Sequence, residues 1–211
     1  MLENIRGILW DWNGTLLNDT ELSVQTMNQM LQKRNLPPLS LDGYKNVFSF
    51  PVKDYYQKIG FDFISEPFEV PALEYIDMYN CQVQHCGLHA HAVTVLKHFQ
   101  KQGIRQFILS AMEQQTLNQC LEQQEIIQYF EHVSGLDNHY ATSKLLNGQE
   151  LISTLNMDVN ELILIGDTVH DYEVASHLGC KCVLIANGHQ ARHILESTGV
   201  PVIDRVKDLL P

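Results

Sequence analysis

Residues 8–16 read ILWDWNGTL and pass from apolar side chains to a carboxylate within a few positions. A short apolar run that ends in a turn is typical of a strand buried in a parallel sheet. Such a strand would place Asp11 at the carboxyl edge of the sheet, where open α/β sheets bind their ligands. Asn13 and Gly14 are turn residues, which allow backbone amides to face a bound anion. Asp11 is therefore a candidate nucleophile towards phosphoryl groups and a candidate metal ligand.

From about residue 84 onward the chain alternates between apolar runs and amphipathic segments. We expect strands at residues 104–109, 130–134, 162–165 and 182–185. The spacing of apolar residues predicts helices over 92–99, 113–123, 144–155 and 171–178. Strands that alternate with helices favour parallel βαβ units, and fully apolar strands favour a sheet covered on both faces. The predicted fold class is α/β, with a doubly wound parallel sheet.

Residues 17–83 lack this alternation and instead show helical spacing. One helix begins near Leu22 and ends before Pro37, a second covers 52–59 and stops at Gly60, and a third covers 73–83. A helical insert therefore interrupts the α/β part just after its first strand. We expect an α/β core made of residues 1–16 and 84–211, and a small α-helical cap domain made of residues 17–83.

The composition excludes several classes of protein. The chain has 211 residues with 45% apolar residues, and its net charge of −11 argues against binding to nucleic acid or to an anionic membrane. No apolar run reaches the length of a membrane span, and the N-terminus lacks the basic and apolar regions of a signal peptide. An odd number of cysteines, five, indicates reduced thiols. We expect a cytoplasmic protein that is a monomer or a homodimer.

Two further predicted strands also end on polar residues. Ser110 follows one apolar run, Asp167 follows another, and Asp171 comes four residues later. Because the carboxyl ends of parallel strands meet at one edge of a sheet, these side chains are expected to lie near Asp11. Asp11 and Asp167 can share one Mg²⁺ ion, which prefers oxygen ligands. The cation would let a carboxylate and a phosphate approach each other.

Lys144 completes a set that suits phosphoryl transfer. It opens a predicted helix between the strand that ends at Ser110 and the strand that ends at Asp167. Ser110 can donate a hydrogen bond to a phosphoryl oxygen, and Lys144 can pair with the same group as a point charge. Phosphoryl transfer demands mainly positioning and charge stabilisation. The expected partner is therefore a small phosphorylated metabolite.

Taken in order, these motifs resemble those of the haloacid dehalogenase superfamily of phosphohydrolases, and the resemblance covers nearly the whole chain. Residues 11–16, DWNGTL, are similar to its first motif, Asp-x-Asp-Gly-Thr-Leu. Ser110 resembles the second motif and Lys144 the third, while residues 166–171, GDTVHD, resemble the fourth, Gly-Asp-x-x-x-Asp. The resemblance implies a Rossmann-like core, and the helical insert looks like the family's cap.

The resemblance also implies a role for each matching residue. Asp11 would be the nucleophile that forms an aspartyl-phosphate. Mg²⁺ would be held by the carboxylates of Asp11 and Asp167 and by the backbone carbonyl of Asn13, with Asp171 in support. Thr15 would help to position the first loop.

The phosphoryl group would be bound by Thr15, Ser110, Ala111 and Lys144, and Lys144 would also restrain Asp11. The implied activity is that of a Mg²⁺-dependent phosphatase on a small metabolite similar in size to phosphoglycolate. The cap would close to exclude water and to select the substrate.

Position 13 departs from the family pattern, which has a second aspartate there that protonates the leaving group and then activates water. An amide such as that of Asn13 cannot exchange a proton in this way, and such help is worth roughly 10²–10⁴-fold in rate. Three interpretations follow. The leaving group needs little protonation, or solvent or a cap residue substitutes, or the chain is a catalytically weak phospholigand-binding or regulatory protein on the same scaffold.

Three other kinds of chemistry remain as alternatives. Relatives that act on phosphonates use a cap lysine, for which Lys53 and Lys45 are candidates. Relatives that act on carbon–halogen bonds need no Mg²⁺, so Asp167 and Asp171 argue against that branch. A receiver-like phosphoacceptor also uses an acid, a hydroxyl and a lysine at strand ends, but the helical insert and the late metal motif argue against it.

Overall fold

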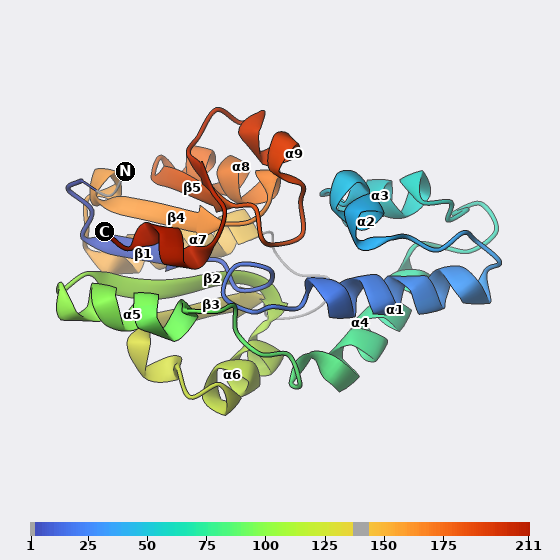
Figure 1. The fold of residues 1–211 in the computed structure, drawn as a ribbon, viewed down its shortest axis with the longest axis horizontal. Coiled ribbons are helices and arrows are strands. Elements are labelled where there is room, and N and C mark those ends of the chain that lie inside the picture. Colours follow the sequence, from blue (N-terminus) through green and yellow to red (C-terminus); the bar gives the residue numbers. More distant parts are fainter. Residues whose placement is uncertain (1–2, 137–143) are drawn as a thin grey trace.

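The computed structural model describes residues 3–136 and 144–211, which form a parallel sheet flanked by helices and a separate helical part beside it (Figure 1). The described strands are β1 (Gly7–Trp10), β2 (Arg105–Glu113), β3 (His132–Leu136), β4 (Leu162–Gly166), β5 (Lys181–Ile185) and β6 (Val202–Ile203). They pair in parallel in the order β3-β2-β1-β4-β5-β6. The first strand of the chain therefore lies in the middle of the sheet.

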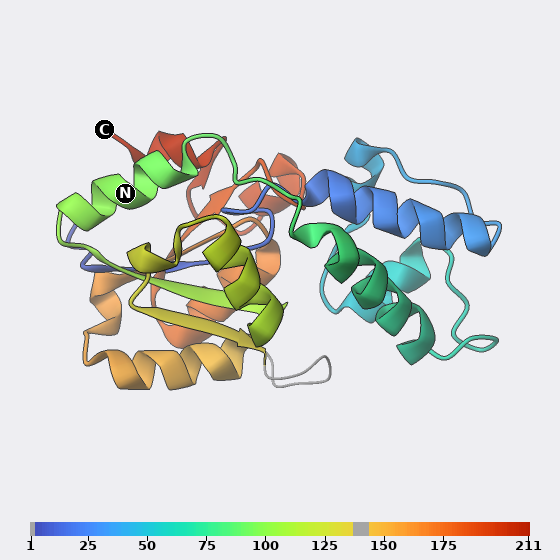
Figure 2. The same cartoon turned by 90° about the horizontal axis from the view of Figure 1, so that it is seen from below.

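Helices cover both faces of this sheet. One face packs against α5 (Ala92–Lys101), α6 (Gln114–Gln123) and the 3-10 helix Val206–Leu209. The other face packs against α7 (Lys144–Leu155), α8 (Val169–Leu178) and α9 (Arg192–Glu196), and Figure 2 shows α5 and α7 on opposite sides. The predicted doubly wound α/β fold is confirmed.

The two covered faces explain why the central strands β1 and β4 carry no polar side chains. In β1 the side chains of Ile8 and Trp10 belong to the apolar cluster on one face, and Leu9 belongs to the cluster on the other. Successive side chains of a strand point to opposite faces, so every side chain of a strand that is covered on both faces is buried and tends to be apolar. The first polar residue, Asp11, comes where β1 ends.

The register of the central strands places the ends of β1 and β4 side by side. Trp10 pairs with Ile108 of β2 and with Ile165 of β4. The backbone N–H of Asp11 then donates to the carbonyl of Ile165 at 2.9 Å. Since Asp167 follows Ile165 by two residues, this register brings the two acids to the same edge.

The helical part contains α1 (Thr20–Lys33), α2 (Leu41–Val47), α3 (Val52–Lys58) and α4 (Glu69–Val83). It has an apolar cluster of its own, which includes Met27, Met30, Tyr55 and Tyr56. We refer to this part as the cap, and the division into a core (1–16 and 84–211) and a cap (17–83) stays a proposal.

Most predicted elements lie within about two residues of the observed ones, and the differences have physical reasons. The strand expected to end at residue 109 continues past Ser110 to Glu113, because Glu113 pairs again with Leu136 of β3 after an irregularity in the register. The helices α2 and α9 and the strand β6 were not predicted. They span only seven, five and two residues, which is too short to show a periodic pattern.

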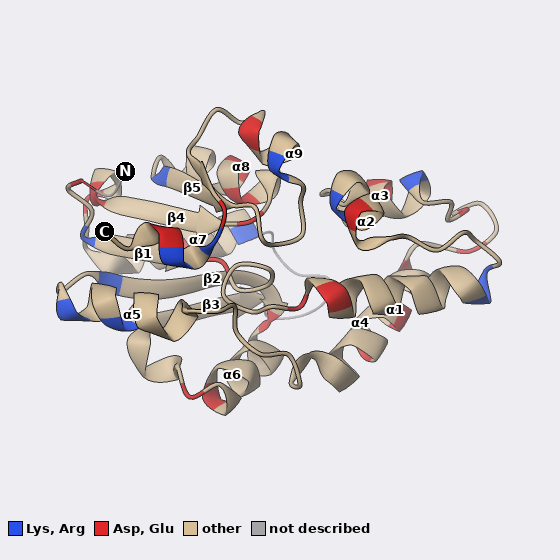
Figure 3. Ribbon diagram, viewed as in Figure 1, with Lys and Arg blue, Asp and Glu red and all other residues tan. Residues whose placement is uncertain are grey.

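Two features bear on the partners that the composition excludes. Within the described ranges, no helix is both long and apolar enough to cross a membrane. In Figure 3 the Lys and Arg residues lie scattered over the core and the cap, interspersed with Asp and Glu.

A cluster of charged side chains ties α1 to α4 in the cap. Arg34 donates to Glu66 at 2.7 and 2.9 Å and to Glu74 at 2.7 Å. Partial burial raises the pKa of Glu74, but hydrogen bonds from Lys33 and Arg34 outweigh it and hold this pKa below its usual 4.5. A carboxyl whose pKa is lowered by folding stabilises the fold above its unfolded pKa, and this contribution is lost as the pH falls through the folded value.

We predict that Arg34→Met lowers the free energy of unfolding at pH 7 by about 1 kcal/mol, since this is the upper range for exposed ion pairs. The midpoint of thermal unfolding should fall by roughly 2–4 °C. At a pH well below 4.5 the carboxyls of both proteins are protonated, so the difference should shrink. Calorimetry at the two pH values measures it, and an equal difference at both would contradict the assignment.

Candidate active site

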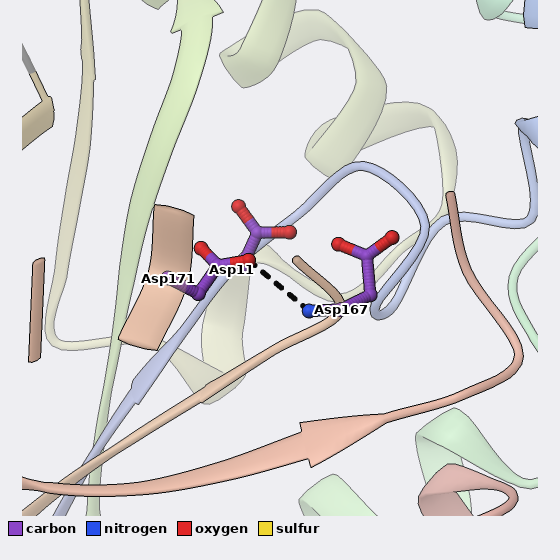
Figure 4. A group of neighbouring side chains, drawn as sticks. All are labelled: Asp11, Asp167 and Asp171. Atoms are coloured by element: carbon purple, nitrogen blue, oxygen red, sulfur yellow. Dashed lines mark hydrogen bonds between the residues drawn. The ribbon is translucent and has the colours of Figure 1, made fainter. Parts of the chain in front are cut away.

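Three buried carboxylates meet at the carboxyl edge of the sheet. Asp11 follows β1, Asp167 follows β4, and Asp171 lies in the first turn of α8. One oxygen from each lies within 4.8 Å of the other two, and Figure 4 shows the three side chains side by side. The dashed line in Figure 4 marks the hydrogen bond from the backbone N–H of Asp167 to Asp171, at 3.1 Å.

A buried ammonium group joins two of these acids. Lys144, the first residue of α7, donates from Nζ to Oδ1 of Asp11 and to Oδ1 of Asp171, each at 2.5 Å. Burial alone would lower the pKa of Lys144, but the charges of Asp11 and Asp171 raise it well above its usual value. Lys144 is therefore a charged donor that fixes the position of Asp11.

Asp171 is fully engaged in holding the turn between β4 and α8. Its Oδ2 accepts from the backbone N–H of Thr168 at 2.9 Å and from the Thr168 hydroxyl at 2.7 Å. Burial raises the pKa of Asp171, but Lys144 and Thr168 outweigh it and lower this pKa. A Cβ at Gly166 would lie 2.3 Å from Cγ of Asp171, so this approach requires glycine. Asp171 therefore positions Lys144 and stabilises the turn between β4 and α8.

The protein alone does not balance the negative charge that Asp11 and Asp167 carry when both are ionised. Burial raises the pKa of Asp11 to about 6 although Lys144 lowers it, and burial also raises the pKa of Asp167 well above its usual value. Three carboxylates against one ammonium leave two negative charges, which a divalent cation would neutralise. An all-oxygen donor set suits Mg²⁺, so the residues present fit the ion that the resemblance implies.

Thr15 contacts both Asp11 and Asp167. Its hydroxyl donates to Oδ2 of Asp11 at 3.0 Å and lies 3.4 Å from Oδ1 of Asp167. The loop after β5 holds Asp167 from the other side, because the backbone N–H of His189 donates to its Oδ2 at 2.5 Å. A Cβ at Gly188 would lie 2.0 Å from that same oxygen. The carboxylate of Asp167 is therefore placed by backbone that approaches it closely.

The first loop is closed by a residue outside the predicted set. Asp19, which directly precedes α1, accepts from the backbone N–H of Gly14 at 2.8 Å and from Nδ2 of Asn13 at 3.0 Å. The hydroxyl of Tyr79 donates to Asp19 at 2.5 Å and accepts from Asn13 at 2.8 Å. The side chain of Asn13 is thus tied to the start of the cap.

His189 connects Asp19 to the cap from the core side. Its Nε2 lies 3.3 Å from Oδ1 of Asp19, and its Nδ1 lies 2.9 Å from the hydroxyl of Tyr44 in α2. Burial alone would lower the pKa of His189, but the carboxylate of Asp19 raises it to about 9. The core loop therefore presents an imidazolium to the cap.

Sequence reasoning missed Asp19 and His189, although one signal was present. Residues 186–190 follow β5, and the rule that strand ends meet at one edge applies to β5 as it does to β4. Asp19 gave no such signal, since an acid before a helix is common as a cap.

The other predicted residues are placed as follows. Ala111 lines the cavity described below, whereas Ser110 is fully buried, does not line it, and accepts at its hydroxyl from the backbone N–H of Met112 at 3.0 Å. Nζ of Lys53 lies 5.8 Å from the ring centre of Phe63, and this side chain does not line the cavity either. The roles of Ser110 and Ala111 stay predictions.

A cavity of about 370 Å³ joins this cluster to the cap. Its polar end is formed by Asp11, Lys144, Asp167 and Asp171, and its other end lies among aromatic side chains of the cap. A phosphate ester would find charged groups at one end and apolar walls at the other.

We predict that Gly188→Ala weakens binding of a divalent cation by at least about tenfold, because the added methyl group displaces the carboxylate of Asp167. Calorimetric titration with MgCl₂ measures the affinity. The matched control is Gly87→Ala, since a Cβ at Gly87 meets nothing within 4 Å. Equal affinities in Gly188→Ala and the parent would show that Asp167 is not a ligand.

A second prediction concerns the Asn13–Asp19 contact. Asn13→Asp replaces a donor 3.0 Å from Asp19 with a second carboxylate, so the protein should lose about 1–3 kcal/mol of stability. The double variant Asn13→Asp with Asp19→Asn restores one donor and one acceptor and should recover most of the loss. Chemical denaturation in the presence of a chelator measures both, and an unchanged single variant would refute the contact.

Comparison with known proteins agrees with this geometry. Residues 8–185 match the family model described as haloacid dehalogenase-like hydrolase. A phosphoglycolate phosphatase from Pseudomonas fluorescens is 22% identical over 98% of this chain and 79% of its own, and the pyrophosphatase PpaX from Bacillus mycoides is 24% identical over 98% and 96%.

Solved structures show the same fold. A haloacid dehalogenase-like hydrolase from Bacteroides fragilis superposes with a TM-score of 0.83 at 18% identity, covering 98% of this chain and 100% of that one. A haloacid dehalogenase-like family protein from Streptococcus pneumoniae gives 0.79 at 19% identity, covering 98% and 97%. The family match spans most of the chain and includes the first and fourth motifs, so the chain belongs to the haloacid dehalogenase-like hydrolase family.

Proposed function

We propose that this protein is a Mg²⁺-dependent phosphatase that hydrolyses a small phosphorylated metabolite through an aspartyl-phosphate at Asp11. The observation that carries the proposal is the buried contact of Lys144 with Asp11 and Asp171, beside Asp167 and at the end of a cavity. A carboxylate held by an ammonium group and backed by uncompensated negative charge suits phosphoryl transfer, which depends on position and charge.

The proposed reaction has two displacements at phosphorus. A carboxylate oxygen of Asp11 attacks phosphorus, the bond to the leaving oxygen breaks, and that oxygen takes a proton from water. Water then attacks the same phosphorus, the bond to Asp11 breaks, and inorganic phosphate leaves with the carboxylate restored. Bound Mg²⁺ would supply charge neutralisation between the carboxylates and the phosphoryl oxygens.

The residues of the chain supply orientation and exclusion of water. Lys144 and Thr15 each donate to one oxygen of Asp11, which limits rotation of the nucleophile. Asp171 holds Lys144 in place. The cap contacts the core through the His189–Tyr44 hydrogen bond and shields the reacting atoms from solvent.

The names of relatives support phosphorus chemistry and differ in the substrate. The Pseudomonas relative is called a phosphoglycolate phosphatase and the Bacillus relative a pyrophosphatase. These names favour an enzyme over the weak binding protein that Asn13 raised as an alternative. A cytoplasmic location, a monomeric or homodimeric state and the lack of nucleic-acid binding stay predictions.

We predict that Asp11→Asn lowers phosphate release by about 10³-fold or more, because the amide cannot attack phosphorus. Release of nitrophenol from p-nitrophenyl phosphate in Mg²⁺ buffer measures this, and a chelator should abolish activity of the parent. Asp77→Asn, which changes an exposed cap acid in the same way, is the control. Asp11→Asn with the activity of the parent would remove Asp11 from the mechanism.

The covalent intermediate has a direct chemical test. Borohydride reduces an acyl phosphate to an alcohol, so quenching the enzyme during turnover should convert part of Asp11 to homoserine. Peptide mass spectrometry locates the change. Reduction at another acid, or at none while phosphate is being released, would contradict an aspartyl-phosphate at Asp11.

A further inference from the structure

We propose that the cap cavity holds a planar aromatic leaving group, so that the substrate is an aryl phosphate monoester. This rests on the proposed phosphatase function and narrows its substrate class.

The cavity runs from the nucleophile into the body of the cap. Beyond Asp11 and Lys144 it is lined by Met27 of α1, Tyr56 of α3 and Ala72 of α4. These elements belong to the cap, so a phosphate bound at Asp11 would direct its leaving group between the cap helices. The volume of about 370 Å³ exceeds what a two-carbon leaving group needs.

The walls of this cavity are aromatic. Eight aromatic side chains of the described residues line it. Among them are Tyr44, Phe48, Tyr55, Tyr56, Tyr75 and Tyr79. Several meet edge to face, as Tyr44 and Tyr55 do at 89° between ring planes. Aromatic rings favour such edge-to-face or offset contacts with another ring, so these walls suit a flat guest.

The basic side chains that line the cavity are already engaged with neighbouring groups. Lys144 donates to two carboxylates, and His189 faces Asp19. His170 stacks on Phe50 with ring centres 4.6 Å apart.

Arg34 and Lys53 of the cap lie outside the cavity and are engaged elsewhere. Arg34 pairs with Glu66 and Glu74, and Lys53 lies over the ring of Phe63. Across the described part of the chain, no unpaired Lys or Arg lines the cap end of the cavity. A leaving group with its own carboxylate or phosphate would be buried there without a counter-charge, which is costly.

The residue at position 13 also favours an aryl ester, for a separate chemical reason. Asn13 cannot protonate a leaving oxygen, and its amide is held by Asp19 and Tyr79. A phenol ionises near pH 10, about as tyrosine does, so a phenolate can depart with the bonding electron pair and be protonated later by water. An aliphatic alkoxide is far more basic and needs the proton as it leaves. The amide is therefore compatible with an aryl ester.

Turnover of three esters by the Mg²⁺-loaded enzyme separates the effect of ring binding in the cavity from the effect of the leaving group's basicity. Benzyl phosphate has a ring but an alkoxide leaving group, phenyl phosphate has a ring and a phenolate, and phosphoglycolate has neither. We expect KM for benzyl phosphate to be at least about tenfold below that for phosphoglycolate, and kcat for phenyl phosphate at least about tenfold above that for benzyl phosphate. A kcat/KM for phosphoglycolate equal to or above that for phenyl phosphate would overturn the proposal.

A binding arm is independent of turnover. Phenylphosphonate and phosphonoacetate are uncleavable analogues of the aryl ester and of phosphoglycolate. Calorimetry on the Mg²⁺-loaded protein should give a Kd for phenylphosphonate at least about tenfold lower. Tighter binding of phosphonoacetate would overturn the inference even if the protein is a phosphatase. Loss of turnover on every ester with preferred binding of phenylphosphonate would instead overturn the proposed function alone.

Variants of the cap test the walls. Phe48→Leu keeps an apolar side chain but removes a ring from the cavity, so it should raise KM for phenyl phosphate several-fold and by a larger factor than KM for phosphoglycolate. Phe63→Leu removes a ring of the cap that does not line the cavity, so it should leave KM for both esters unchanged. Thermal unfolding checks that both variants fold. Equal effects of the two variants would contradict the assignment of the cavity.

Discussion

The structure of the site depends on one buried contact, in which the ammonium group of Lys144 lies between the carboxylates of Asp11 and Asp171. Residues from β1, α7 and α8 meet there, so the contact ties distant parts of the sheet edge together. A buried ion pair is costly unless its members are well paired, and here each carboxylate has further donors. The excess negative charge that remains on Asp11 and Asp167 is what makes the site suited to a divalent cation.

A second polar cluster connects this site to the cap. Asp19 accepts hydrogen bonds from the backbone N–H of Gly14 and from the side-chain amide of Asn13, and it faces the imidazolium of His189. The aspartate that the family pattern places at position 13 is absent, and the nearest carboxylate of this cluster belongs to position 19. The cap, the first loop and the loop after β5 therefore share one set of charges. This arrangement explains how an amide at position 13 is accommodated.

Sequence patterns predicted the sheet and the edge well, because both depend on local rules. Apolar runs mark strands buried on both faces, and the polar residue that ends each run marks the edge, as Asp11 and Asp167 do. Ser110 also follows an apolar run, yet it is buried and does not line the cavity, and β2 continues past it to Glu113. The position of His189 could not be predicted in the same way, because it depends on how the loop after β5 folds back towards the site. Tertiary contacts of this kind leave no periodic trace in the chain.

The most direct test is a crystal structure of the protein with Mn²⁺ and beryllium fluoride, a mimic of a phosphoryl group. We expect an anomalous Mn²⁺ peak bound by the carboxylates of Asp11 and Asp167, with trifluoroberyllate bonded to an oxygen of Asp11. An Mn²⁺ peak away from both residues, or trifluoroberyllate attached to a different side chain, would contradict it.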